Sequence, residues 1–130
     1  MPHDGQELDG QDGYRLRLIG ITPELLEMEA IYGGTGQMPP LHLHPSQDER
    51  FEVLEGTLRA VIEGQELVYE AGASFEVPAG TVHQMTADPP ARMRWEVRPA
   101  LRTAELFETL YSGAAGPDFL ERFSAEVRLA

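Results

Sequence analysis

Three histidines and one glutamate form the group of residues in this sequence whose types and spacing could do chemistry. They are His42, His44, Glu49 and His83. In a strand, His42 and His44 project from one face with Cα atoms about 6.6 Å apart, so both imidazoles can converge on one ion. Three neutral imidazoles and one carboxylate would hold a divalent ion with one net positive charge. They would also leave one or two coordination positions open for water, dioxygen or a substrate oxygen.

The segment after the first two histidines predicts how the carboxylate would join them. Pro45 ends the strand, and residues 45–48 are enough to reverse the chain, so that Glu49 returns on the neighbouring strand. Asp48 and Glu52 compete with Glu49 for this role. Asp48 falls in the turn and Glu52 faces the opposite side of the strand, so Glu49 is the expected ligand.

Alternation of apolar and polar residues predicts the strands that would position the site. It is present at 14–18, 26–30 and 92–98, with further short strands expected near 49–55, 57–63, 66–70, 74–78 and 82–87. Gly56 is interpreted as one of the separating turns. Pro78 and Gly80 predict a type I turn, with Pro78 at its second position, that directs the strand carrying His83. Many short strands without intervening helices predict an all-β antiparallel sandwich or barrel, expected over residues 14–100.

The two ends of the chain differ from this pattern. Residues 1–13 are polar with Leu8 as an apolar anchor, which predicts a flexible N-terminal arm. His3 lies in that arm and is not expected to bind the metal. Residues 101–130 predict a helical extension of two short helices, with Thr103 as the N-cap of the first and Pro117 in the first turn of the second. An apolar stripe runs along them (Leu106, Phe107, Leu110, Tyr111, then Phe119, Leu120, Phe123, Val127) and is interpreted as core packing.

Composition excludes several classes of function. Ten basic and 22 acidic side chains give a net charge of −12, which repels nucleic acid and anionic membranes. Lysine and cysteine are both absent, which excludes Schiff-base lysines, disulfides and thiolate chemistry. Four arginines near the C-terminal strands are interpreted as a solvated outer face: Arg92, Arg94, Arg98 and Arg102. No apolar run is long enough to span a membrane, and a cytoplasmic protein is expected.

Two segments of this sequence resemble the two motifs of the cupin superfamily. The first is carried by Gly36, His42, His44, Glu49 and Gly56, and the second by Gly72, Pro78, Gly80 and His83. Ala87 stands where the second motif usually closes with asparagine, a position that is not a metal ligand in the family. The resemblance is to small single-domain members. It implies a double-stranded β-helix (the cupin or jelly-roll barrel) with one divalent ion (Fe, Mn, Ni or Zn) held by the three histidines and Glu49.

Strand parity predicts the walls around the ion. The side chains expected to line the pocket are Met38, Pro40, Phe51, Val53, Met85, Met93, Trp95 and Val97. Such an apolar pocket favours a small, partly hydrophobic or aromatic ligand whose oxygen atoms bind the metal.

Three functions are compatible with this site. The leading hypothesis is a metal-dependent dioxygenase acting on a small organic substrate. One alternative is a non-catalytic module that senses or binds a small molecule. The other is an isomerase or epimerase, for which Glu29 and Tyr69 are candidate acid–base residues. A homodimer is expected, because the edge strands of a small barrel are commonly covered by a second copy.

Overall fold

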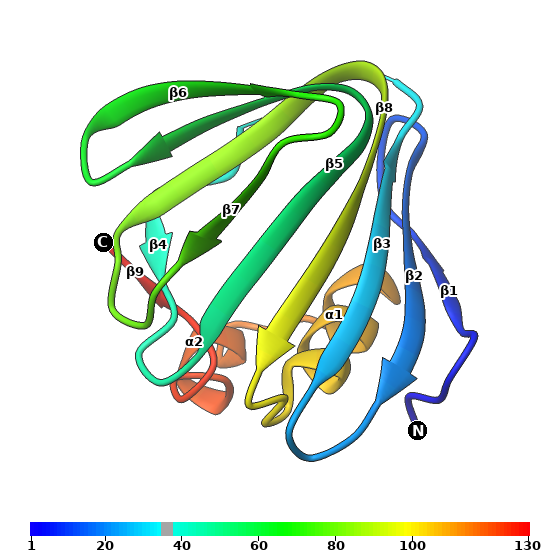
Figure 1. The fold of residues 1–130 in the computed structure, drawn as a ribbon. Helices are drawn as coiled ribbons and strands as arrows, with labels where there is room; N and C mark the ends of the chain where they lie inside the picture. Colours follow the sequence, from blue (N-terminus) through cyan, green and yellow to red (C-terminus); the bar gives the residue numbers. More distant parts are fainter. Residues whose placement is uncertain (35–37) are drawn as a thin grey trace.

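The computed structural model describes residues 1–34 and 38–130, and it consists mainly of antiparallel strands (Figure 1). The strands are β1 (Glu7–Asp9), β2 (Tyr14–Ile21), β3 (Leu26–Tyr32), β4 (His42–Leu43), β5 (Asp48–Ile62), β6 (Gln65–Glu70), β7 (Ser74–Val77), β8 (His83–Arg98) and β9 (Arg128–Leu129). The helices are α1 (Thr103–Tyr111) and α2 (Phe119–Arg122). The expected β architecture with two C-terminal helices is confirmed. Gly36 of the first motif lies outside the described residues.

The two longest strands, β5 and β8, organise the sheet. They pair with each other along most of their length. The first half of β5 also pairs with β7, and its second half pairs with β6. From β8 the sheet continues through β3 and β2 to β1 in one direction and to β4 and β9 in the other. In Figure 1 the strands curve around an interior, and both helices lie at its lower end.

The prediction that Gly56 lies in a turn between two strands was wrong. β5 is continuous through Gly56, with shifts of register against β8 on either side of Glu55. Gly56 has a φ of +80°. A Cβ added at this position would lie 2.5 Å from the carbonyl oxygen of Pro90. Gly56 therefore bends a long strand close to its partner instead of reversing the chain.

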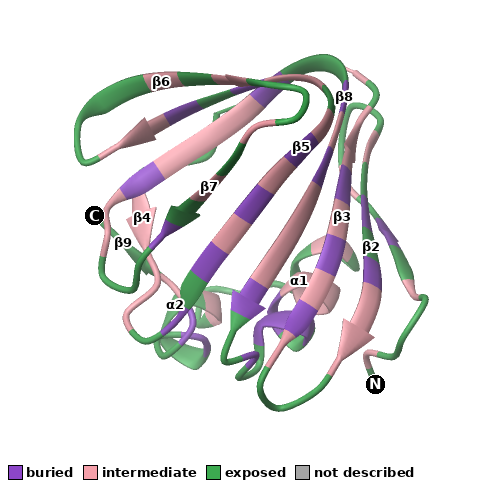
Figure 2. Cartoon of the chain, in the orientation of Figure 1, coloured by how far each residue is buried: buried purple, intermediate pink, exposed green. Residues whose placement is uncertain are grey.

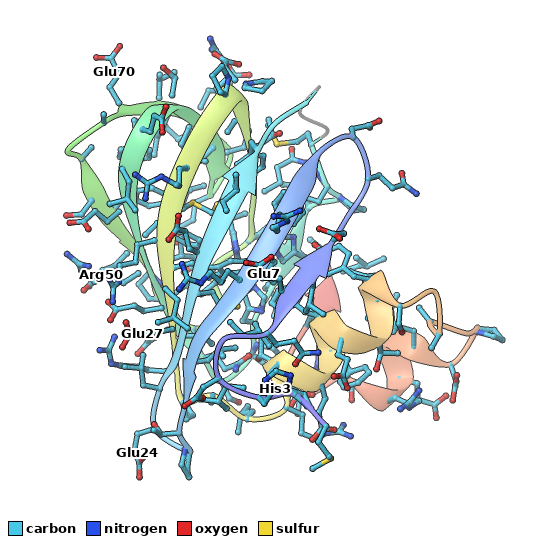
Figure 3. All side chains as sticks on the ribbon, turned by 90° about the vertical axis from the view of Figure 1, so that its right-hand side faces the viewer. His3, Glu7, Glu24, Glu27, Arg50 and Glu70 are labelled. Carbon is cyan, nitrogen blue, oxygen red and sulfur yellow. The ribbon has the colours of Figure 1, made fainter. Side chains whose placement is uncertain are left out.

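Burial alternates along the strands, as expected for a sheet with one face toward a core (Figure 2). In β2, Leu16 and Leu18 are fully buried. Charged side chains such as Glu7, Arg50 and Glu70 project to the outside (Figure 3). The arginines of β8 pair on this outer face with neighbouring glutamates: Arg92 with Glu29, Arg94 with Glu27, and Arg98 with Glu96. The prediction of a solvated outer face for these three arginines is confirmed.

Part of the N-terminal segment, expected as a flexible arm over residues 1–13, forms a short strand. Residues Glu7–Asp9 form β1, which pairs with β2 and buries Leu8. The start of α1 also differs from the prediction, because Arg102 occupies the N-cap position and Thr103 is the first helical residue. The Thr103 hydroxyl instead accepts a hydrogen bond from buried Gln47, at 2.7 Å. Across the described residues, neither helix has the length and apolar character needed to traverse a lipid bilayer.

Candidate metal centre and its cavity

The three histidines of the sequence motifs come together at one point. His42 lies on β4 and pairs directly with His83, the first residue of β8, while His44 follows β4. Their ring centroids are 4.4–5.3 Å apart. One nitrogen from each ring lies within 4.8 Å of the other two, in a group that could hold a metal ion. The predicted convergence of these side chains is therefore present in the fold.

A turn between β7 and β8 fixes the position of His83 relative to His44. The amide of Thr81 donates to the carbonyl of Pro78, at 3.2 Å, so Pro78 is the first residue of the turn and not the second, as predicted. Gly80 is then the third residue, where its φ of +79° is a conformation that favours glycine. The Gly80 amide donates to the carbonyl of His44, at 2.8 Å, which ties the turn to the first motif.

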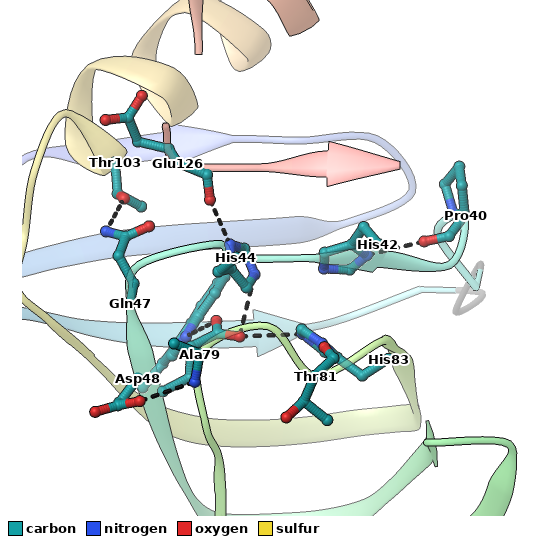
Figure 4. A network of polar contacts seen from close by, with 12 residues as sticks. Pro40, His42, His44, Gln47, Asp48, Ala79, Thr81, His83, Thr103 and Glu126 are labelled. Carbon is teal, nitrogen blue, oxygen red and sulfur yellow. Dashed lines mark hydrogen bonds and ion pairs between the residues drawn. The ribbon is translucent and has the colours of Figure 1, made fainter. Parts of the chain in front are cut away.

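Each histidine uses its Nδ1 atom to contact a backbone carbonyl. The partners are the carbonyls of Pro40 for His42 (2.8 Å), Glu126 for His44 (2.7 Å) and Thr81 for His83 (2.8 Å), as Figure 4 shows. A carbonyl only accepts, so each Nδ1 carries the hydrogen and donates it. In a neutral ring this leaves a lone pair on Nε2, the form that binds metals. Three rings are thus oriented as ligands by the backbone itself.

Glu49, the expected fourth ligand, lies on β5 beside two of the three histidines. Its Oε1 atom lies 3.1 Å from Nε2 of His44 and 3.0 Å from Nε2 of His83. Its other oxygen, Oε2, accepts a hydrogen bond of 2.8 Å from Nε1 of Trp95. Of the other two acidic candidates, Asp48 accepts from the amide of Ala79, and Glu52 pairs across the sheet with Arg94 and Ser74.

The contacts of Glu49 require a positive charge. Burial raises the pKa of this carboxyl, but the two adjacent imidazoles lower it by more, to about 2, so the group is an anion at neutral pH. At His44 burial lowers the pKa, and the Glu49 carboxylate raises it by more. Glu49 Oε1 and His44 Nε2 are buried, and neither has a hydrogen-bond partner within the described chain. A proton or a metal cation between them removes the repulsion of two lone pairs.

The donor set fits a first-row divalent ion. Imidazole nitrogens and a carboxylate oxygen suit Fe, Mn, Ni and Zn, and no thiolate competes because the chain has no cysteine. Two ligand atoms bound at right angles to one ion, each at about 2.1 Å, lie about 3.0 Å apart. That is the separation of Glu49 Oε1 from two of the imidazole nitrogens.

Comparison with known proteins assigns the family. A cupin-domain family model matches residues 30–97, just over half of the chain. The chain is a cupin. A solved RmlC-like cupin from Shewanella frigidimarina NCIMB 400 has a TM-score of 0.68 at 22% identity, covering 76% of this chain and 87% of that chain. The expected double-stranded β-helix is confirmed by this likeness.

Two curated relatives are similar over shorter segments. Quercetin 2,3-dioxygenase from Bacillus subtilis (strain 168) is 36% identical over 62 residues, which are 48% of this chain and 18% of that protein. Oxidoreductase iacF from Pestalotiopsis fici (strain W106-1 / CGMCC3.15140) is 42% identical over 52 residues, 39% of this chain and 26% of that protein. This cupin therefore matches roughly a fifth to a quarter of the length of either relative.

The histidines of this cupin open into a cavity of about 730 Å³. Five of the eight predicted wall residues line it: Pro40, Phe51, Met85, Met93 and Trp95. Met38, Val53 and Val97 are not among its described lining residues. Met38 is exposed, whereas Val53 and Val97 are buried in the core. On β5 and β8 parity placed the predicted side chains on the inner face, but it did not give how far along each strand the cavity extends, and Met38 and Pro40 lie before β4, outside any strand.

Other lining residues were not predicted from the sequence. The apolar stripe of α1, including Phe107 and Tyr111, forms part of the wall in addition to packing on the core. Tyr14 and Tyr32, at paired positions of β2 and β3, also line the cavity. A signal for these residues was present, because the tyrosines continue the inward-facing alternation of their strands.

The C-terminal segment contributes to the candidate metal centre through the backbone. β9 pairs with β4 at His42, and the Glu126 carbonyl accepts the hydrogen bond from His44. The Glu126 side chain is buried and lies 3.7 Å from the Arg102 guanidinium, while the Arg102 amide donates to it at 3.3 Å. Arg102 also donates to the carbonyl of Arg122 and lies over the ring of Phe123. Arg102 therefore fixes the position of the C-terminal segment, whose Glu126 carbonyl orients His44.

We expect Arg102→Ala to loosen this attachment. A buried Glu126 without its cationic neighbour should lower the free energy of unfolding by about 1–3 kcal/mol. Hydrogen exchange over residues 123–130 should become faster, and metal affinity should fall because His44 loses a fixed carbonyl partner. Arg17→Ala is the matched control, since it removes the same charge from an exposed position of β2, away from the C-terminal segment, and should change stability by less than about 0.5 kcal/mol. Equal exchange rates in the two variants would show that Arg102 has no such role.

Proposed function

We propose that this cupin is a metal-dependent dioxygenase that acts on a small organic substrate bound through oxygen atoms. The observation that carries the proposal is the convergence of three imidazole nitrogens, each oriented by a backbone carbonyl, with the buried oxygen of Glu49 beside two of them. The relatives named as a dioxygenase and an oxidoreductase support an oxidative reaction, although they match only part of each protein.

The residues of the chain have separate roles in this proposal. His42, His44, His83 and Glu49 would hold the ion. Trp95 keeps Glu49 in place by donating a hydrogen bond to its second oxygen, Oε2. When bound, a redox-active divalent ion would supply the site at which substrate oxygen and dioxygen are activated. The aromatic and methionine walls would limit the contact of bulk water with that position.

Oxygen uptake by the Fe(II)-loaded protein tests the proposal. With a panel of neutral diols and enols, we expect one O₂ consumed per substrate and both atoms of ¹⁸O₂ recovered in product. Saturable binding of these compounds without any oxygen consumption would contradict the dioxygenase proposal and favour the non-catalytic binding module. Conversion of a substrate to an isomer under nitrogen would favour the isomerase.

The acid–base candidates for an isomerase lie away from the cavity. Glu29 pairs with Arg92 on the outer face, at 3.1 Å. Tyr69 lies on β6 with its ring stacked 4.0 Å from that of Phe75. Neither is among the described residues that line the cavity, so the isomerase has no specific support. The homodimer and the cytoplasmic location stay predictions.

A further inference from the structure

Most aromatic side chains of this cupin form one continuous series of ring contacts. The series contains all four tyrosines, the single tryptophan and three of the five phenylalanines. Neighbouring ring centroids are 4.0–6.0 Å apart, in the order Tyr69, Phe75, Phe51, Trp95, Phe107, Tyr111, Tyr14 and Tyr32. Aromatic rings at such separations interact directly. The proposed metal chemistry gives no role to the series as a whole.

Trp95 is the member of the series that lies next to the candidate metal centre. Its Nε1 atom donates a hydrogen bond of 2.8 Å to Oε2 of Glu49, whose other oxygen lies beside His44 and His83. One hydrogen bond and one carboxylate therefore join the indole ring to the place of the ion. Indole and phenol are the aromatic side chains that lose an electron most readily. An oxidant at the metal position would therefore find Trp95 as its first aromatic electron donor.

On one side of Trp95 the series leads to a cluster of three tyrosines. The ring of Phe107 lies 5.2 Å from that of Trp95 and 6.0 Å from that of Tyr111, so one phenylalanine separates the indole from the first phenol. Tyr14 and Tyr32 continue the series beyond Tyr111, with centroid separations of 5.8 and 5.1 Å. Tyr111 is half-buried and lines the cavity, so its phenolic proton can pass to water.

On the other side of Trp95 the nearest phenol is farther away. Two phenylalanines, Phe51 and Phe75, lie between Trp95 and Tyr69. Phenylalanine is not oxidised by agents that oxidise tyrosine, so an electron must cross both rings in one step. The step from Tyr111 crosses only one ring and should be the faster of the two.

The cavity contains side chains that such a transfer of electrons would protect. Met85 and Met93 line it together with the histidines. Oxidation of methionine to the sulfoxide turns an apolar side chain into a polar one and disrupts packing. The chain has no cysteine, so no thiol can be oxidised in their place. Tyrosines at a distance from the histidines are the remaining donors.

We propose that Trp95 and Tyr111 form an electron relay, across the ring of Phe107, that carries oxidising equivalents away from the candidate metal centre. Trp95 gives one electron to a one-electron oxidant that peroxide forms at the metal position, and it keeps its Nε1 hydrogen. It regains an electron from Tyr111, whose phenolic proton passes to water, so that a neutral tyrosyl radical remains. Ascorbate or another one-electron reductant in solution restores the phenol with one electron, and water supplies the proton. The inference rests on the proposed function only for the origin of the oxidant.

Pulse radiolysis of the zinc-loaded full-length protein with azide radicals tests the relay without any turnover. Zinc has no redox chemistry. An azide radical becomes azide by taking one electron from an indole in preference to a phenol, and Trp95 is the single tryptophan of the chain. We expect the absorption of the tryptophanyl radical to decay while that of a tyrosyl radical rises, at a rate independent of protein concentration.

Tyr111→Phe should lose this fast phase, because the next phenol is then separated from Trp95 by two phenylalanine rings. Tyr69→Phe is the matched control and should keep the fast phase, because Tyr69 ends the longer side of the series. The relay is overturned by an unchanged fast phase in Tyr111→Phe, by its loss in Tyr69→Phe, or by a tryptophanyl radical in the parent that decays without a tyrosyl signal.

Peroxide treatment of the Fe(II)-loaded protein tests the protective role. Mass spectrometry should find severalfold more sulfoxide at Met85 and Met93 in Tyr111→Phe than in the parent or in Tyr69→Phe. Equal sulfoxide in the three proteins would overturn protection by the relay. If the zinc protein shows the fast phase but the iron form consumes no oxygen with any substrate, the dioxygenase proposal fails and the relay stands.

Discussion

His83→Ala should abolish stoichiometric metal binding. The residue is 1% exposed and its Nε2 lies 3.0 Å from Glu49 Oε1, so its removal takes away one proposed ligand and leaves the carboxylate with one imidazole fewer. Loss of residues that only orient metal ligands costs 10–100-fold in affinity, and loss of a ligand should cost more than about 100-fold. Elemental analysis of protein purified without a nickel column should show about one ion per chain in the parent and under about 0.1 in the variant.

Two further variants make this experiment decisive. His3→Ala removes a histidine from the exposed N-terminal segment and should keep the full metal content (Figure 3). His42→Ala changes a half-buried member of the triad, so it should lose the metal even if His83→Ala does not fold. Circular dichroism establishes that each variant is folded. Undiminished metal in folded His42→Ala and His83→Ala proteins would rule out this centre.

Gly56→Ala should be among the most destabilising single substitutions in the barrel. A φ of +80° strains any residue with a Cβ, and here the added carbon would also lie 2.5 Å from the Pro90 carbonyl oxygen and 2.8 Å from the Ala91 Cβ. Left-handed strain and overpacking together should lower the free energy of unfolding by about 3–5 kcal/mol. Urea unfolding followed by circular dichroism measures this loss.

Gly64→Ala separates the two causes. Gly64 has nearly the same φ, +78°, but an added Cβ would meet no atom within 4 Å. Gly64→Ala should lower the free energy of unfolding by only about 1–2 kcal/mol, the cost of the left-handed conformation alone. If Gly56→Ala were no more harmful than Gly64→Ala, the close approach of β8 to β5 at this point would not be a constraint on the fold.

Short-range patterns in the sequence predicted the convergence of the three histidines and most of the strands. His42 lies on β4 and His44 directly follows it, so the strand period of two and the reversal of the chain after Pro45 were enough to infer the return of Glu49 beside His44. The same parity identified Trp95 and Met93 as wall residues. It failed at Val53 and Val97 because it carries no information about distance along a strand.

Features that depend on backbone atoms from distant segments could not be predicted. The orientation of His44 depends on the backbone carbonyl of Glu126, 82 residues away. Every residue has such a carbonyl, so the residue type does not indicate which one accepts the hydrogen bond. β9 is too short to show alternation, and Gly56 has the same residue type whether it turns a chain or bends a strand. The role of α1 in the cavity was missed because an apolar helix face looks the same against a core or a ligand.

The most direct test of the metal centre is a crystal structure of the cobalt-loaded protein with anomalous data collected at the cobalt edge. We expect one strong anomalous peak per chain, within about 2.0–2.3 Å of the Nε2 atoms of His42, His44 and His83 and bonded also to Glu49 Oε1. The Nδ1 atoms should keep their backbone carbonyl partners. A peak elsewhere, or density for the four side chains with no ion among them at saturating cobalt, would contradict the account.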